Sequence, residues 1–216
     1  SMMILILKQQ RLLLTMSESV LILGSEGLVG KELYNRIKKR YKVFRVDLFN
    51  LDQEEYASAD LTNERSWSEL PEKFLDSNHF VNCAYPKDKN YGKNAIEAKL
   101  TDIMRNLNLL VSSNLSLLKF LSEKFLHDRK KVNIVNIGSI YGHILPKFDI
   151  YEGQSFSMPI EYGIAKSSLN YMNRYFLKLV NDKRFRVNSV SPGGIFDNHS
   201  KEFIAKYAKY SLEDSM

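Results

Sequence analysis

The chain has 216 residues, 44% of them hydrophobic, and a net charge of +6. This length suits one α/β domain with a full core, and the apolar content excludes a disordered chain. The single cysteine, Cys83, excludes an internal disulfide and suits a reducing cytoplasm. The basic residues are scattered along predicted helices without interleaved aromatics, which argues against nucleic-acid binding.

Residues 1–15 need separate treatment. Their apolar runs are interrupted by Lys8 to Arg11, so the segment is too short to span a bilayer and lacks the unbroken apolar core of a signal peptide. We interpret 1–15 as an N-terminal extension and 16–216 as the domain. No other segment is apolar for long enough to cross a membrane.

The domain opens with a pattern typical of a phosphate site. Ser19 to Leu23 predicts a buried strand, three glycines follow within residues 24–30, and a helical pattern then runs to about Lys39. Glycines let the backbone approach a phosphate, and the helix N-terminus supplies N–H groups and positive potential. The apolar residues expected to face inward are Leu28, Leu33 and Ile37.

An acidic residue follows the second predicted strand, Lys42 to Val46. Asp47 lies 17 residues beyond Gly30, where an acid binds the adenosine ribose diol of a dinucleotide. It would repel a 2′-phosphate, and the glycine loop has no Lys or Arg to attract one. Both features favour NAD over NADP, although Asp47 could also simply cap a loop.

The next stretch carries less information. Asp60 could bind an adenine amino group or cap a helix predicted from about Asn63 to Leu75, on which Trp67 is a core residue or a surface anchor. A strand is expected from Asn78 to Asn82, and an exposed loop rich in Lys, Asn and Asp follows it.

A long helix is predicted from about Ile96 to His127, with one polar residue, Asn114, in its apolar stripe. A buried amide must have partners, so Asn114 is a satisfied core residue, bends the helix around a water, or serves a site. The other members of the stripe are Ile103, Leu107, Leu110, Leu118, Leu121 and Phe125.

Val132 to Gly138 predicts a central strand with Ser139 at its carboxyl end, where sites form in open α/β sheets. After an aperiodic stretch, Pro159 opens a helix that reaches about Val180 and carries Tyr162 and Lys166. Their spacing places an ammonium beside a phenol, which would lower the pKa of the phenol and suit it to proton transfer. A last strand, Phe185 to Val190, and a helix near 198–210 follow.

Taken together, these motifs resemble the short-chain dehydrogenase/reductase family over about residues 19–210: the glycine loop, Asp47, Asn82-Cys83-Ala84, Asn114, Asn136-Ile137-Gly138-Ser139, Tyr162-xxx-Lys166 and Ser191-Pro192-Gly193. The resemblance implies an enzyme with a single-domain α/β fold, a Rossmann-type doubly wound parallel sheet that binds NAD. The implied catalytic set is Asn114, Ser139, Tyr162 and Lys166.

The resemblance also implies the cofactor contacts. Tyr162 would act as the acid/base and Lys166 would bind the nicotinamide ribose, Asp47 would bind the adenosine ribose, and no metal is implied. The residues implied to bind cofactor are Gly24, Glu26, Gly27, Leu28, Gly30, Asp47, Asp60, Leu61, Asn82, Tyr162, Lys166, Pro192, Gly193 and Ile195.

The chain departs from the family pattern in two places. Ser139 and Tyr162 are 23 residues apart, more than is usual, and the extra residues predict a substrate flap at 143–158. Family members usually continue beyond Tyr210 through a helix and a seventh strand. We therefore expect a sheet that lacks its last strand and has an exposed edge. Either the chain is truncated, or a partner subunit covers that edge.

The segments around Tyr151 and around Pro192 look like those of flagellin-modification and surface-glycan oxidoreductases. The leading hypothesis is a cytoplasmic NAD-dependent alcohol/ketone oxidoreductase acting on a sugar or sugar phosphate for glycan precursor synthesis. The alternatives are a dehydratase or epimerase that recycles NAD in place, and a non-catalytic cofactor-binding subunit. The family further implies a homodimer or homotetramer, and neither a nucleic acid nor a membrane is expected as a partner.

Overall fold

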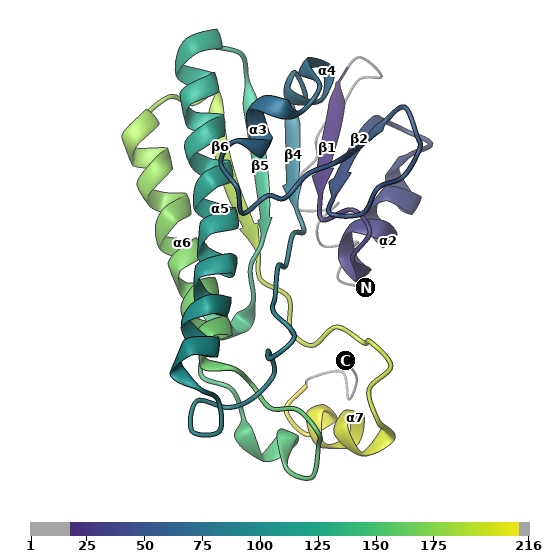
Figure 1. Ribbon diagram of the computed structural model, residues 1–216, viewed down its shortest axis with the longest axis vertical. Coiled ribbons are helices and arrows are strands. Elements are labelled where there is room, and N and C mark those ends of the chain that lie inside the picture. Colours follow the sequence, from purple (N-terminus) through teal and green to yellow (C-terminus); the bar gives the residue numbers. More distant parts are fainter. Residues whose placement is uncertain (1–17, 212–216) are drawn as a thin grey trace.

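A six-stranded parallel sheet with the strand order β3-β2-β1-β4-β5-β6 lies at the centre of the computed structural model, which describes residues 18–211 (Figure 1). The predicted extension at 1–15 lies outside the described residues. The strands are β1 (Ser19–Leu23), β2 (Lys42–Asp47), β3 (Tyr56–Ser58), β4 (His79–Asn82), β5 (Val132–Ile137) and β6 (Phe185–Val190).

The strand order reverses between β1 and β4, which lie side by side although two strands separate them in sequence. Such a reversal is where ligands bind in doubly wound sheets, at the carboxyl ends of the strands. The helical elements are α2 (Leu28–Ile37), α3 (Ser66–Glu69), α4 (Glu72–Leu75), α5 (Leu100–Asp128), η1 (Ile140–Gly142), η2 (Phe148–Tyr151), α6 (Ile160–Val180) and α7 (Lys201–Ala208).

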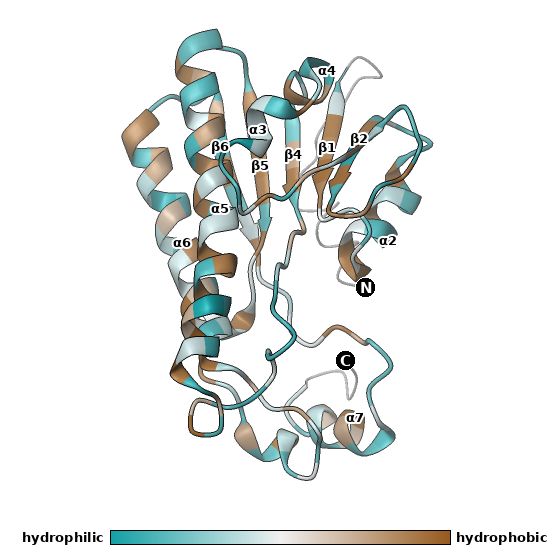
Figure 2. Cartoon of the chain, viewed as in Figure 1, coloured by the Kyte–Doolittle hydropathy of each residue, from teal (hydrophilic) through white to brown (hydrophobic). Residues whose placement is uncertain are grey.

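Two hydrophobic clusters cover opposite faces of the sheet, which is why successive residues of the central strand β1 are hydrophobic on both sides (Figure 2). On one face, α3 to α6 pack against the strands through residues such as Trp67, Leu118 and Phe176. On the other face, Leu33 and Ile37 of α2 pack on β1 and β2. The expected α/β fold with a Rossmann-type parallel sheet is therefore confirmed.

The long predicted elements are confirmed within a few residues, and the short ones are not. The helix predicted over 63–75 is two short helices, because Pro71 lacks an N–H group and holds Leu70 in an extended conformation. The short strand β3 was not predicted. It forms because Tyr56 to Ser58 pair with the outer edge of β2.

The prediction that Leu28 faces inward is wrong: its side chain is 52% exposed at the start of α2. The long helix also begins later than predicted, at Leu100, after a separate turn in which Ala98 N–H bonds the Asn94 carbonyl. Trp67 is a core residue, and its indole N–H donates to Ser116.

β6 forms one edge of the sheet and, within residues 18–211, pairs only with β5. Arg186 and Asn188 on this strand are exposed and alternate with the buried Phe185 and Val187, so one face of β6 is open to solvent. In the same range, none of the helices combines the length and the hydrophobicity that crossing a bilayer requires.

Candidate active site at the carboxyl edge of the sheet

The glycine loop between β1 and α2 forms a tight cradle. Gly24 has a φ of +69°, and a Cβ at Gly30 would lie 2.2 Å from the Gly24 carbonyl oxygen, so neither position accepts a side chain. The hydroxyl of Ser25 is fully buried without a hydrogen-bond partner, and no side chain caps the N-terminus of α2. These free donors fit the pyrophosphate of a dinucleotide.

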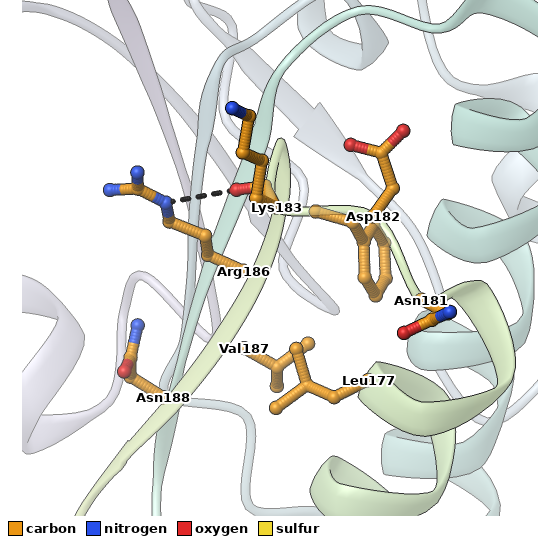
Figure 3. Close-up of a pocket in the computed structure, with 8 residues that line it drawn as sticks. Leu177, Asn181, Asp182, Lys183, Arg186, Val187 and Asn188 are labelled. Atoms are coloured by element: carbon orange, nitrogen blue, oxygen red, sulfur yellow. Dashed lines mark hydrogen bonds between the residues drawn. The ribbon is translucent and has the colours of Figure 1, made fainter.

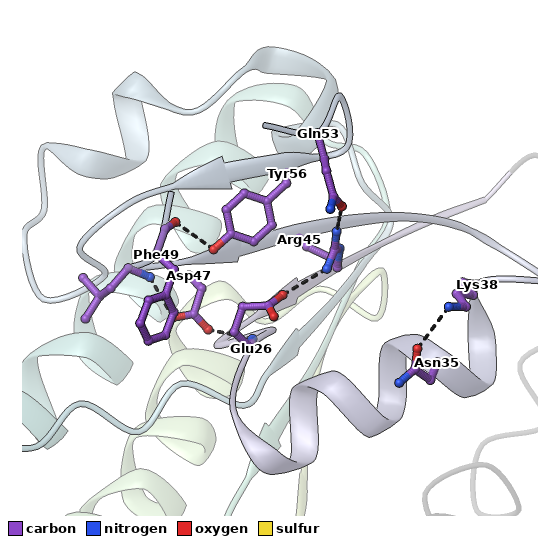
Figure 4. Close-up of polar contacts among 9 residues, drawn as sticks. Glu26, Asn35, Lys38, Arg45, Asp47, Phe49, Gln53 and Tyr56 are labelled. Atoms are coloured by element: carbon purple, nitrogen blue, oxygen red, sulfur yellow. Dashed lines mark hydrogen bonds and ion pairs between the residues drawn. The ribbon is translucent and has the colours of Figure 1, made fainter. Parts of the chain in front are cut away.

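Asp47 lies at the end of β2 beside this cradle (Figure 4). One carboxylate oxygen accepts a hydrogen bond from the Glu26 backbone N–H at 2.8 Å, and the other accepts one from Leu48 N–H at 2.7 Å. Each carboxylate oxygen can accept a further bond, so Asp47 can still bind a ribose diol. The residue thus has both of the roles considered from the sequence, because it also orders the loop.

Asp60 follows Ala59, whose backbone N–H donates to the Asp47 carbonyl at 2.9 Å. The exposed carboxylate of Asp60 accepts hydrogen bonds from the backbone N–H and the hydroxyl of Thr62, at 2.9 and 2.7 Å. Asp60 therefore closes the turn before α3, which is close to the capping role considered from the sequence. Leu61 is buried in the core, so contact with an adenine would involve its backbone.

Ser139, Tyr162 and Lys166 lie together at the carboxyl end of β5. Ser139 follows Gly138 at the end of β5 and is buried; its hydroxyl accepts the Tyr141 N–H at 3.1 Å and lies near enough to the Tyr162 hydroxyl to lower its pKa. The Lys166 ammonium donates to the Ile137 carbonyl at 2.6 Å and lies 5.6 Å from the centre of the Tyr162 ring. Two groups that can exchange a proton with a substrate oxygen thus lie beside a fixed cation.

Burial shifts both titrating groups of this cluster. It raises the pKa of Tyr162 above its ordinary value, against the lowering effect of the Ser139 hydrogen bond. It lowers the pKa of Lys166 to about 8. The expectation that the pKa of Tyr162 lies below its usual value is therefore wrong, because burial of the phenol is the largest effect on it.

A row of buried amides connects this cluster to the sheet. Asn82 donates to the side-chain oxygens of Asn114 and Asn136, at 2.9 and 3.2 Å, and its own oxygen accepts the Ala84 N–H. Asn114 donates to the Leu110 carbonyl one turn earlier. Asn114 is thus a satisfied buried residue, and its bond to Asn82 brings α5 to the site.

The row continues into the helix that carries Tyr162. Asn136 donates to Asn173 at 2.8 Å, and Asn173 donates to the Ser189 hydroxyl at 2.9 Å. The sequence analysis did not single out Asn173. An asparagine on the apolar face of that predicted helix is the signal that could have found it.

The last part of the site comes from the segment after β6. Ile140 N–H donates to the Pro192 carbonyl at 3.0 Å, which places this segment beside Ser139. Gly194 N–H donates to the Tyr207 hydroxyl of α7, so Gly193 and the half-buried Ile195 lie between β6 and that helix. The predicted flap packs Ile150 and Tyr151 against Phe203, so 143–158 and α7 form one layer beyond the sheet (Figure 1).

Two aromatic residues of this site were missed by the sequence analysis. The Tyr85 ring packs edge-on against Tyr162, with 5.7 Å between ring centres, and also lies 5.6 Å from the Lys166 ammonium. Its hydroxyl contacts the hydroxyl of Tyr91, and burial raises the pKa of both groups. Neighbouring Cys83 is no nucleophile, because burial raises the pKa of its thiol to about 12.

A separate hollow of about 380 Å³ lies at the amino end of β6 (Figure 3). Sites in open α/β sheets form at the carboxyl ends of strands, so we do not assign this hollow a role in the site. None of the predicted site residues lines it. Its lining residues are Leu177, Asn181, Asp182, Lys183, Phe185, Arg186, Val187 and Asn188.

The sequence is similar to that of a flagellin-modifying protein, although no family model matches it. The chain is 30% identical over 218 residues to "Post-translational flagellin modification protein A" of Campylobacter coli, which covers 91% of this chain and 84% of the relative. The resemblance expected from the segments around Tyr151 and Pro192 is thereby confirmed.

Solved structures show the same fold. A short chain dehydrogenase from Leptospira borgpetersenii with bound NAD+ superimposes with a TM-score of 0.81 at 23% identity, covering 96% of this chain and 85% of the other. A short chain dehydrogenase from Burkholderia cenocepacia in complex with NADP gives a TM-score of 0.66 at 17% identity, covering 85% and 74%. The two cofactors differ, so the fold alone does not decide between them.

Proposed function

The chain belongs to the short-chain dehydrogenase/reductase family and is an NAD(P)-dependent oxidoreductase, and we propose that it uses NAD to interconvert an alcohol and a ketone on a sugar or sugar phosphate. The observation that supports this most is the cluster of Ser139, Tyr162 and Lys166 at the same sheet edge as the glycine loop. Gly24 lies against Ala84, which follows β4, the strand between β1 and β5, so only one strand separates the loop from the cluster.

When bound, NAD supplies the hydride acceptor or donor. The protein residues handle the proton: Ser139 holds the substrate oxygen, and Tyr162 gives a proton to it or takes one from it. Lys166 keeps a positive charge beside the phenol at neutral pH, since its pKa is about 8. Asn114 fixes the neighbouring turn of α5 through its bond to Asn82.

The raised pKa of Tyr162 means that the phenol keeps its proton at neutral pH. A protonated phenol can donate to the carbonyl oxygen of a ketone directly. Oxidation of an alcohol instead requires the phenol to lose its proton first, so we expect this direction to become faster as the pH rises.

We assign NAD rather than NADP because Asp47 lies beside the glycine loop with capacity to accept ribose hydroxyls. Its negative charge would repel a 2′-phosphate. Gly24, Glu26, Gly27, Leu28 and Gly30 are then the residues of the loop nearest the pyrophosphate, with Asn82, Pro192, Gly193 and Ile195 toward the nicotinamide.

The sugar substrate is inferred from the similarity to flagellin modification protein A. A role in making flagellin or surface-glycan precursors would explain that similarity. The segment 143–158 and α7, which pack on each other beyond the sheet edge, would serve as the flap over such a substrate. The single Cys83 and the use of NAD support a cytoplasmic location.

We further propose a homodimer or homotetramer that forms through α5 and α6. Large apolar residues are exposed along the outer side of α6 at steps of four and seven, a stripe that suits burial against another helix. The exposed residues are Ile160, Ile164, Tyr171, Tyr175 and Leu179 on α6, with Leu100, Met104, Leu115 and Leu126 on α5.

The test of the function is NADH absorbance against a panel of amino-sugar phosphates and nucleotide sugars, in both directions. A compound that drives NAD reduction or NADH oxidation supports the proposal. Product formed without net NADH would instead indicate a dehydratase or epimerase. Bound NAD without turnover of any compound in the panel would count against a sugar oxidoreductase.

A further inference from the structure

A buried cation lies close to the proposed ribose site. Arg45 is in the middle of β2 and only 7% exposed, and one Nη atom donates to Glu26 Oε1 at 2.9 Å (Figure 4). The other Nη atom donates to Gln53. The guanidinium also lies against two aromatic rings, 4.1 Å from the centre of Tyr34 and 5.2 Å from that of Tyr56.

This ion pair is connected directly to Asp47. Arg45 and Asp47 are two residues apart on one strand, so their side chains leave the same face of the sheet. Glu26 joins them, because its carboxylate pairs with Arg45 while its backbone N–H bonds the Asp47 carboxylate. Among residues 18–211, no other arginine or lysine forms a salt bridge with either acid.

The three charged residues Glu26, Arg45 and Asp47 have a net charge of −1, because the two acids contribute −2 and Arg45 contributes +1. An arginine is well suited to bind a phosphate, because its fork of N–H groups matches the phosphate oxygens. Here both ends of the fork are already bound, to Glu26 and to Gln53. A 2′-phosphate would therefore meet net negative charge and an arginine that is already paired.

We propose that Glu26 is a specificity-determining residue, which keeps Arg45 paired so that the site rejects NADP. Arg45 is then a latent phosphate-binding residue, and Asp47 alone does not account for the preference. This inference rests on the proposed function only in that the site must bind a dinucleotide.

The experiment measures the dissociation constants of NAD+ and NADP+ by calorimetry for the wild type and for D47N, E26Q and E26Q/D47N. Replacing Asp47 alone removes one charge but leaves Arg45 paired, so the gain in NADP affinity is small. Replacing both acids leaves the positive charge of Arg45 without an acid to neutralise it, so NADP binds at least tenfold more tightly than to D47N, and added salt weakens that binding. Equal NADP affinities of D47N and E26Q/D47N would overturn the inference.

Two further variants separate Arg45 from other causes. Arg45→Met on the E26Q/D47N background should abolish the gain, and a gain that survives would show that it does not come through Arg45. If E26Q/D47N does not fold, Gln53→Ala on the D47N background is the alternative. Gln53 lies in an exposed loop, and its replacement removes the hydrogen bond to the second Nη atom of Arg45. NADP is again expected to bind more tightly than to D47N. A wild type that binds neither dinucleotide would instead refute the proposed function.

Discussion

At the scale of single residues, the site depends on competition between burial and charge. Tyr162 and Lys166 occupy positions that favour an ion pair in a helix, yet burial raises the pKa of the phenol and lowers that of the ammonium. The result is a proton donor beside a cation whose charge is lost not far above neutral pH. This arrangement leads to two predictions.

The first concerns the phenol. Tyr162→Phe removes the proton donor and keeps the ring, so turnover should fall by roughly a hundredfold or more, as is usual when a general acid is lost. NAD binding, followed by calorimetry, should change little. Tyr171→Phe, an exposed residue on the same helix, is the control and should behave as the wild type. Full activity of Tyr162→Phe would remove this residue from the mechanism.

The second concerns the ammonium. The pKa of Lys166 is about 8 in the folded protein against an ordinary value of 10.5, so between these values the unfolded chain binds the proton and the folded chain does not. The free energy of unfolding should therefore rise with pH across this window, by up to about 3 kcal/mol relative to Lys166→Met. Urea unfolding at several pH values measures the difference.

The comparison with Lys166→Met is needed because other groups titrate nearby. Burial raises the pKa of the Cys83 thiol to about 12, which makes the folded state less stable as the pH rises above 9. The variant keeps the larger, burial part of that contribution, which cancels in the difference, and loses only the smaller lowering effect of the Lys166 charge on the thiol pKa. Lys178→Met, at an exposed lysine of the same helix, should give a curve parallel to the wild type. A parallel curve for Lys166→Met would show that Lys166 is not desolvated.

The candidate catalytic residues could be found from the sequence by their spacing. The burial and the contacts of individual side chains could not. The positions of Ser139, Tyr162 and Lys166 followed from strand ends and a helical spacing of four. Arg45 could not be interpreted in the same way, because its role depends on Glu26 and Gln53, which only the folded chain brings to it.

At the scale of elements, the buried amides connect α5, β4, β5, α6 and β6. The donor and acceptor ends of these amides are fixed. The Ala84 N–H can only donate, so the atom of Asn82 that it contacts must be the side-chain oxygen. Asn82 must then donate to Asn136, and Asn136 to Asn173. The row thereby holds the helix that carries Tyr162 in register with the strand that ends at Ser139.

The prediction at this scale is that Asn173→Leu leaves the Asn136 amide and the Ser189 hydroxyl without their partner. The loss should destabilise the fold by about 1–3 kcal/mol and lower kcat more than it weakens NAD binding. Urea unfolding and steady-state kinetics measure the two effects. Asn108→Leu, at an exposed asparagine of α5, is the control. Unchanged stability would show that the row carries no net free energy.

Long helices and strands could be predicted from the sequence more reliably than short ones. The helix α6 and the buried strands β1 and β5 have clear apolar patterns, and the edge strand β6 begins with alternating apolar and polar residues. The strand β3 has three residues and no pattern of its own, and exists through its pairing with β2. The exposure of Leu28 was missed because a helix that begins at a binding loop turns its first residue toward solvent.

At the scale of the whole molecule, the glycine loop and the Ser139 cluster lie at the carboxyl ends of the strands, while the outer sides of α5 and α6 expose several large apolar residues. Tyr171 and Leu179 are 65% and 60% exposed on α6. Burial of such a stripe favours association. The proposed oligomer would cover these helices and leave the sheet edge with the site free.

We predict that the wild type is a dimer or tetramer by light scattering and that Tyr171→Glu combined with Leu179→Glu converts it to a monomer. Two charges in the stripe should prevent its burial without touching the core. Lys39→Glu, at an exposed lysine just after α2 on the opposite face of the sheet, should leave the assembly unchanged. A monomeric wild type would refute the proposed assembly directly.

The central claim is that one dinucleotide binds along the carboxyl ends of the strands with its reactive end at Tyr162, and a crystal structure with NAD+ tests it most directly. The account predicts the adenosine ribose on Asp47, the pyrophosphate at the N-terminus of α2, and the nicotinamide ring beside the Ser139 and Tyr162 hydroxyls. A dinucleotide bound elsewhere, or a nicotinamide ring distant from Tyr162, would contradict it.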